Sequence, residues 1–141
     1  MADRQPQLQC ETVRTKGTAF ADIDNDGDLD LYVVNWGAPN KLYENNQNDK
    51  NWLKIKLTGT ISNRDAYGAK VRIYAPGTNK LLAMRELRSA NGFCAQEPQV
   101  LHFGLKSGQP CDLAVEFPSG RLVKLADVKA GQTLDIVEPA N

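Results

Sequence analysis

Hydrophobic and polar residues alternate along much of the chain from residue 51 onward, in short runs separated by turn residues. In residues 52–57 every second position is Leu or Ile and the positions between them are lysines, and the same period recurs in residues 69–75, 112–117 and 133–137. This alternation is typical of strands with one buried face and one solvated face, as in antiparallel sheets. The pattern predicts an all-β fold, with an antiparallel β-sandwich or barrel-like domain over residues 51–138.

The first fifty residues are patterned differently. Residues 1–16 are polar and show no periodicity, so we expect a flexible lead-in there. A short strand is expected to end at Ala21, and the β-branched and aromatic run 31–34 predicts a buried strand. Residues 41–44 could form one more short strand, and the polar residues 45–50 are the expected linker.

The alternation does not decide the structure of residues 80–88 or the roles of His102 and the two tryptophans. Residues 80–88 are rich in good helix formers, but their neighbours are strands and we expect a strand there as well. His102 lies in a short apolar run that indicates a strand, and we expect it to be hydrogen-bonded and structural instead of catalytic. Trp36 and Trp52 are expected in core or interdomain packing.

The formal net charge is zero, but it arises from two unlike halves. The first fifty residues carry five basic and nine acidic side chains, and the remainder carries twelve basic and eight acidic. This balance excludes a polybasic nucleic-acid binder. No apolar run approaches the roughly 18 residues of a membrane span, and residues 1–10 do not form a secretion signal.

Five aspartates at every second position account for the acidic half: Asp22, Asp24, Asp26, Asp28 and Asp30. They repel one another unless a cation lies among them. Calcium takes six to eight hard oxygen ligands, and Gly27 permits a sharp turn around the ion. We therefore expect a Ca²⁺ site with carboxylate ligands from the first three aspartates and Asp30, and a carbonyl ligand from Asp28. The alternative is a solvated turn without an ion.

An EF-hand is the obvious comparison for this spacing, and two features argue against it. The twelfth position of the loop is Val33 where an EF-hand has a bidentate Glu. The residues that follow the loop favour a strand, where an EF-hand has a helix. The pattern therefore predicts a calcium loop within a β-hairpin.

Three cysteines, Cys10, Cys94 and Cys111, have no zinc-finger spacing, so a structural zinc site is not expected. All three could be free thiols, or Cys94 and Cys111 could form a disulfide in an exported protein.

Two irregular segments are candidates for ligand binding, since loops on a rigid scaffold often carry binding sites. The first contains Arg64 and Asp65, and the second contains Asn91, Phe93 and Gln96. No nucleophile elbow is present, and nothing places two carboxylates for glycoside hydrolysis. We expect a protein that is not an enzyme, with a hydrolase as the alternative.

The loop and its flanks carry a recognisable pattern. Residues 17–31 with Asn35 and residues 40–45 resemble an FG-GAP/VCBS repeat, the calcium-loop blade unit of integrin-type β-propellers, over residues 17–46. The remainder resembles the ASPIC/UnbV domain, which follows such repeats in exported proteins. The residues that carry this second resemblance are 51–53, 62–65, 68–71, 101–105 and 117–121.

These resemblances imply an extracellular or periplasmic calcium-binding module for adhesion or for binding a protein or carbohydrate, with Ca²⁺ locking the loop. Neither nucleic acid nor membrane insertion is implied. A propeller needs about four to eight blades, and the chain has one partial blade. That blade is expected to pack on the sandwich or on a second copy, giving a homodimer, and the chain could be a fragment. The alternatives are a carbohydrate-active enzyme or a structural cap of a β-propeller.

Overall fold

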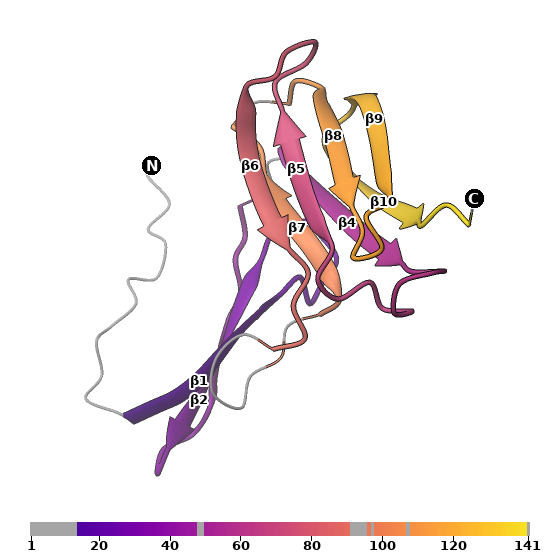
Figure 1. Ribbon diagram of the computed structural model, residues 1–141. Helices are drawn as coiled ribbons and strands as arrows, with labels where there is room; N and C mark the ends of the chain where they lie inside the picture. The colour runs from indigo at the N-terminus through magenta and orange to yellow at the C-terminus, as the bar shows by residue number, and fades with distance from the viewer. Residues whose placement is uncertain (1–13, 48–49, 91–95, 97, 107, 141) are drawn as a thin grey trace.

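The computed structural model describes residues 14–47, 50–90, 96, 98–106 and 108–140, and these residues form an all-β protein (Figure 1). The described strands are β1 (Arg14–Ala21), β2 (Asp30–Trp36), β3 (Lys41–Tyr43), β4 (Trp52–Thr58), β5 (Lys70–Tyr74), β6 (Leu81–Glu86), β7 (Val100–Gly104), β8 (Cys111–Glu116), β9 (Leu122–Val128) and β10 (Gln132–Val137). Within these ranges the structure has no helix of the length and apolar character that a membrane span requires.

The N-terminal unit is a three-stranded antiparallel sheet in the order β1-β2-β3. Strand β1 begins at Arg14, inside the segment that was expected to be a flexible lead-in, and it pairs with β2 along its whole length. Figure 1 shows this hairpin as a long twisted ribbon that projects from one end of the sandwich. The Asp-rich loop connects β1 to β2 at the end nearest the sandwich.

The remaining strands form two facing sheets, a three-stranded sheet β10-β4-β7 and a four-stranded sheet β6-β5-β8-β9 (Figure 1). The predicted sandwich is therefore confirmed. The expectation of purely antiparallel pairing is wrong at one place, because β10 runs parallel to β4 with Gln132 opposite Leu53 and Val137 opposite Thr58. A parallel pair needs a long connection, and here the connection is the rest of the domain.

The core lies between these two sheets and follows the alternation seen in the sequence. Leu53, Ile55 and Leu57 of β4 face Val71 and Ile73 of β5, and all five are nearly or completely buried. The ambiguous segment is a strand, β6, as expected, and its side chains are mostly exposed because it lies at the edge of its sheet.

Strand β9 is the one described strand that no sequence pattern above predicts. Its pairing with β8 shifts register between Cys111 and Leu113, so that β9 carries an extra residue. Asp127 lies at this bulge with a φ of 57°, and its amide donates to Asp112 Oδ1 at 3.1 Å. A bulge breaks the period of two, because the residues on either side of it point to opposite faces.

Glu138, directly after β10, is a buried carboxylate that ties the C-terminal strand to the loop after β4. Its Oε2 accepts hydrogen bonds from the backbone amides of Thr60, Ile61 and Ser62 at 2.8–2.9 Å. Its Oε1 accepts from the hydroxyls of Ser62 and Ser119. Burial works to raise the pKa of Glu138, but these hydrogen bonds outweigh it and lower the pKa to about 2.

Two expectations about single residues meet different outcomes. Trp36 is 68% exposed at the end of β2, so the expectation that it packs in a core or interdomain contact is wrong within this chain. Cys111 is a free thiol buried in β8, and burial raises its pKa, with a smaller contribution from Asp112. Cys10 and Cys94 lie outside the described residues.

Candidate functional site

Three of the five loop aspartates converge. One carboxylate oxygen from each of Asp22, Asp24 and Asp30 lies within 4.8 Å of the others. Asp22 follows the end of β1 and Asp30 is the first residue of β2, so the hairpin itself brings the two ends of the loop together. Three hard oxygen donors at this separation are the kind of ligand set that Ca²⁺ prefers.

The loop is also held by hydrogen bonds to these carboxylates. Asp30 is 2% exposed, and its two oxygens accept from the amides of Ile23 and Asn45, each at 2.9 Å. Asp22 Oδ2 accepts from the Gly27 amide at 3.0 Å. Gly27 has a φ of 106°, a conformation that glycine adopts without steric cost. The carboxylates therefore fix the backbone conformation of the loop by accepting these hydrogen bonds, and they also concentrate negative charge in it.

Asp26 and Asp28 do not belong to the converging group. Asp26 Oδ1 accepts from the Asp28 amide at 3.1 Å. Both oxygens of the Asp28 carboxylate are buried. Neither has a hydrogen-bond partner of normal geometry among the described residues. Burial, followed by the charge of Asp26, raises the pKa of Asp28 to about 6, against a lowering influence from the Gln47 amide.

Unsatisfied oxygens indicate that the loop suits a cation. Like the two oxygens of Asp28, Asp22 Oδ1 is buried and has no hydrogen-bond partner in the described part of the chain. A buried carboxylate oxygen without a partner is costly, and a divalent cation relieves both this cost and the repulsion between neighbouring aspartates. The residues present therefore fit a Ca²⁺ ion.

A cation from the protein itself already reaches the loop. Lys54 of β4 forms an ion pair with Asp22 Oδ2, and the two side chains are 13% and 5% exposed. Burial lowers the pKa of Lys54. The contact joins the hairpin loop to the sandwich, and Lys54 also lies 5.0 Å from the centre of the Trp52 ring.

Gly27 makes two further contacts with the sandwich. Its carbonyl lies 2.8 Å from Nε2 of His102 on β7, and its Cα lies against the indole of Trp52 at the start of β4. Burial lowers the pKa of His102, so the ring is neutral at pH 7 and Nε2 carries the proton that it donates. The prediction that His102 is hydrogen-bonded is confirmed, and Trp52 packs against the hairpin loop, as expected for interdomain packing.

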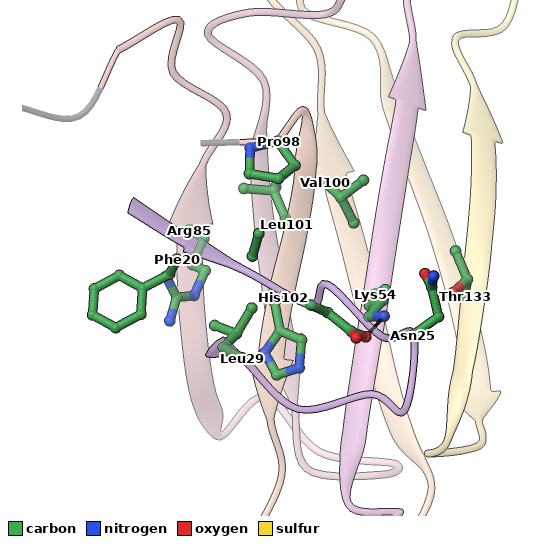
Figure 2. Close-up of a pocket in the computed structure, with 12 residues that line it drawn as sticks. Phe20, Asn25, Leu29, Lys54, Arg85, Pro98, Val100, Leu101, His102 and Thr133 are labelled. Atoms are coloured by element: carbon green, nitrogen blue, oxygen red, sulfur yellow. Dashed lines mark ion pairs between the residues drawn. The ribbon is translucent and has the colours of Figure 1, made fainter. Parts of the chain in front are cut away.

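A cavity of about 670 Å³ lies beside this contact, between the hairpin and the edge of the sandwich (Figure 2). Its walls come from both units, so it exists only while the hairpin is docked. The described residues that line it are Phe20, Ala21, Asp22, Asn25, Leu29, Lys54, Arg85, Pro98, Val100, Leu101, His102 and Thr133.

The weaker candidates lie elsewhere. Arg64 is exposed and Asp65 half-buried in a turn closed by Asn63, whose side chain bonds the backbone of Tyr67 at 2.8 and 2.9 Å. Gln96 is exposed. None of these candidates is among the described residues that line the cavity, and Asn91 and Phe93 lie outside the described residues.

Sequence reasoning missed three side chains that the structure brings together here: Lys54, Arg85 and His102. Lys54 looks like one of two lysines on the solvated face of β4, and Arg85 like an ordinary surface charge. A signal was available only for His102, as the single histidine in an apolar strand. The other two depend on how the hairpin packs, which no local pattern records.

Comparison with known proteins agrees with the second resemblance. The ASPIC and UnbV family matches residues 59–141. Human cartilage acidic protein 1 is 29% identical over 129 residues, which cover 89% of this chain and 19% of that protein. The mouse protein of the same name is 29% identical over 132 residues, 89% of this chain and 20% of its own length. The chain thus spans about a fifth of the curated relatives it matches. Because the family match covers more than half of the sequence, the chain belongs to the ASPIC and UnbV family.

Proposed function

We propose that this protein is a calcium-binding, non-enzymatic interaction module of an extracellular or periplasmic protein, in which Ca²⁺ locks the hairpin loop. The observation that carries the proposal is the convergence of Asp22, Asp24 and Asp30, together with the unpartnered buried oxygens of Asp22 and Asp28. The resemblance of residues 17–46 to an FG-GAP/VCBS repeat supports the same ion.

The ion's proposed role is structural. Asp22 and Asp30 stand at the two ends of the loop, so an ion bound between them would hold the ends of β1 and β2 together. The same loop contacts Trp52 and His102 of the sandwich. Fixing the loop would therefore also fix the hairpin against the domain.

The composition of the cavity supports a role in binding over a role in hydrolysis. Its described lining includes no serine or cysteine, and its one carboxylate, Asp22, is paired with Lys54. His102 uses Nε2 to bond the Gly27 carbonyl and does not face a nucleophile. Neither a nucleophile with its base nor a pair of carboxylates is assembled among these residues.

The location is proposed from relationship. The chain belongs to the ASPIC and UnbV family and is similar to a protein named cartilage acidic protein 1. That name refers to cartilage, and together with the family membership it supports our proposal of an extracellular or periplasmic location for this chain.

Calcium binding is tested by thermal unfolding in excess EDTA and in calcium. A ligand at one hundred times its Kd stabilises a folded protein by about 2.7 kcal/mol, so a clear rise in Tm is expected in calcium. Asp24→Asn keeps the acceptor that the Asp26 amide uses but removes a charge, and it should abolish the rise. Asp135→Asn, on an exposed position of β10, is the matched control and should keep it. Identical melting in EDTA and calcium would refute the proposal.

A second candidate role, the structural cap of a β-propeller, is favoured by the exposed apolar side chains of the hairpin sheet. On one face of this sheet these are Tyr32, Val34, Trp36 and Leu42, each 37–68% exposed. In the absence of neighbouring blades this face would pair with a second copy. Sedimentation velocity should then show concentration-dependent dimers that Trp36→Ser weakens, whereas a strictly monomeric protein would count against the cap.

A further inference from the structure

The cavity beside the calcium loop has two basic ends (Figure 2). Lys54 and Asn25 lie at one end, and Arg85 lies at the other, next to Phe20. The Lys54 end is neutralised by its ion pair with Asp22. The structure shows no ion pair for Arg85 within the described part of the chain. The Arg85 end therefore offers a positive charge without a counter-charge from those residues.

Arg85 is oriented by an aromatic ring. Its guanidinium carbon lies 5.9 Å from the centre of the Phe103 ring, so one face of the group rests on the core. The edges of the guanidinium, which carry its five N–H donors, are not used by this contact. Stacking on the ring already restricts the movement of the arginine side chain, so a ligand that binds it has little further freedom to remove. The planar fork of N–H donors also matches the geometry of a carboxylate.

His102 lies between the two ends and experiences both charges. Besides burial, Lys54 and Arg85 act to lower the pKa of the ring, against the hydrogen bond to Gly27. With Nε2 donating to the Gly27 carbonyl, Nδ1 of the neutral ring is an acceptor. Figure 2 shows this second ring nitrogen turned toward the side of the cavity where Leu29 lies.

The walls between the ends are largely apolar. Phe20 and Leu29 contribute from the hairpin, and Val100 and Leu101 from β7. A volume of about 670 Å³ falls within the roughly 300–1,000 Å³ of small-molecule sites. A few convergent polar groups in an apolar cavity are the usual form of such a site.

We propose that this cavity binds a small organic carboxylate with an apolar body. The carboxylate pairs with Arg85, and the body lies against Leu29 and Leu101. This inference rests on the proposed role as an interaction module and names the class of its ligand. Arg85 and the β7 part of the apolar wall lie outside the aspartate loop, and the ion pair between Lys54 and Asp22 joins the hairpin to the sandwich, so the cavity is expected with or without a bound ion.

The experiment is a titration of the ¹⁵N-labelled chain with indole-3-acetate and, separately, with indole-3-acetamide, followed by NMR. The two probes share one apolar body and differ in charge. The acetate should shift the amide signals of Leu29, Arg85, Leu101 and His102 and should bind about tenfold more tightly than the amide, as expected for a charge-assisted hydrogen bond. Equal binding of both probes, or shifts elsewhere only, would overturn the proposal.

Variants of Arg85 test whether its positive charge causes the preference for the acetate over the amide. Arg85→Gln should remove the preference for the acetate, and Arg121→Gln, outside the cavity, should leave it intact. If Arg85→Gln fails to fold because it loses its contact with Phe103, Arg85→Lys serves in its place. It keeps the charge but loses the planar fork, and it should bind the acetate severalfold more weakly than the original chain. Unchanged affinity in a folded Arg85 variant contradicts the proposal.

The titration is run in excess EDTA and again in calcium. Binding of the acetate in EDTA supports the cavity whether or not the loop takes an ion. Failure of calcium binding would appear in the melting curves described above, while failure of the cavity would appear only in these NMR shifts. The two proposals can thus fail independently.

Discussion

Gly27 of the hairpin loop lies so close to the indole of Trp52 that a methyl group on Gly27 would overlap the ring. The same residue has a φ of 106° and presents its carbonyl to His102. The glycine therefore serves two purposes at once. It turns the aspartate loop, and it lets the loop approach the start of β4 without a side chain between them.

Gly27→Ala should undock the hairpin. The substitution combines a left-handed backbone, which costs about 1 kcal/mol or more for alanine, with a collision that costs about 1–3 kcal/mol. We expect a lower Tm and a red-shifted fluorescence from Trp52 as its indole meets water. Gly37→Ala is the matched control, since Gly37 also has a positive φ, 72°, but has nothing within 4 Å of the added methyl. It should lose only the backbone part, and equal effects of the two variants would argue against close packing as the cause.

Lys54→Met should strengthen calcium binding. Lys54 pairs with Asp22, one of the three converging carboxylates, so the ammonium competes with an ion for that oxygen. Removing it should lower the calcium Kd by about three- to tenfold, measured by isothermal titration calorimetry. The apo protein should at the same time be less stable, because Asp22 loses its partner. Lys56→Met, two residues along on the same face of β4 and exposed, should change neither quantity.

Glu138 should make stability fall in acid. Its pKa is lowered from 4.5 to about 2 in the folded protein, so its carboxylate favours folding fully above pH 4.5. That contribution declines as the pH falls from 4.5 and is gone once the pH passes below the folded pKa. Urea unfolding at a series of pH values between about 2 and 6 should show this slope.

Glu138→Gln should flatten the acid slope. The amide oxygen can still accept from the loop amides, but the group no longer titrates. Glu138→Ala should be more severe, because the amides of Thr60, Ile61 and Ser62 would lose their acceptor. Glu44→Gln, on an exposed position, should keep the slope. A slope that survives Glu138→Gln would assign it to other carboxylates.

Ile55→Ala should cost about 2–5 kcal/mol of the free energy of unfolding, because Ile55 is completely buried at the centre of β4. Leu122→Ala removes a similar volume from a side chain that is 51% exposed and should cost well under half as much. Chemical denaturation of the two variants tests whether the core lies where the structure has it.

The strands were predictable wherever one face is buried. Alternation marked Leu53 and Ile55 as core residues because a period of two assigns each residue to a face. It did not mark β9, where the bulge at Asp127 interrupts the period. Alternation also could not show that β10 runs parallel to β4. Side chains alternate between the two faces of a strand in the same way whether its neighbour runs parallel or antiparallel.

The candidate site was predictable only as far as it is local. Asp22, Asp24 and Asp30 lie within one turn, so their spacing indicated their convergence. Lys54, Arg85 and His102 come from three other strands, and their meeting depends on how the hairpin docks. Trp36 illustrates the reverse error, since apolar character alone predicted burial and the residue stands 68% exposed at the end of β2.

The parallel strand β10 has a consequence for the order of assembly. It completes the sheet of β4 and β7, and Glu138 then closes the loop at residues 60–62. The first strand of the sandwich, β4, and its last strand, β10, must therefore both be present before their shared sheet is complete. During synthesis the hairpin can form as soon as residues 14–43 have emerged, whereas β4 must wait for a neighbour made almost eighty residues later. The sandwich is thus expected to fold after translation of the whole domain, with the aspartate loop already formed beside it.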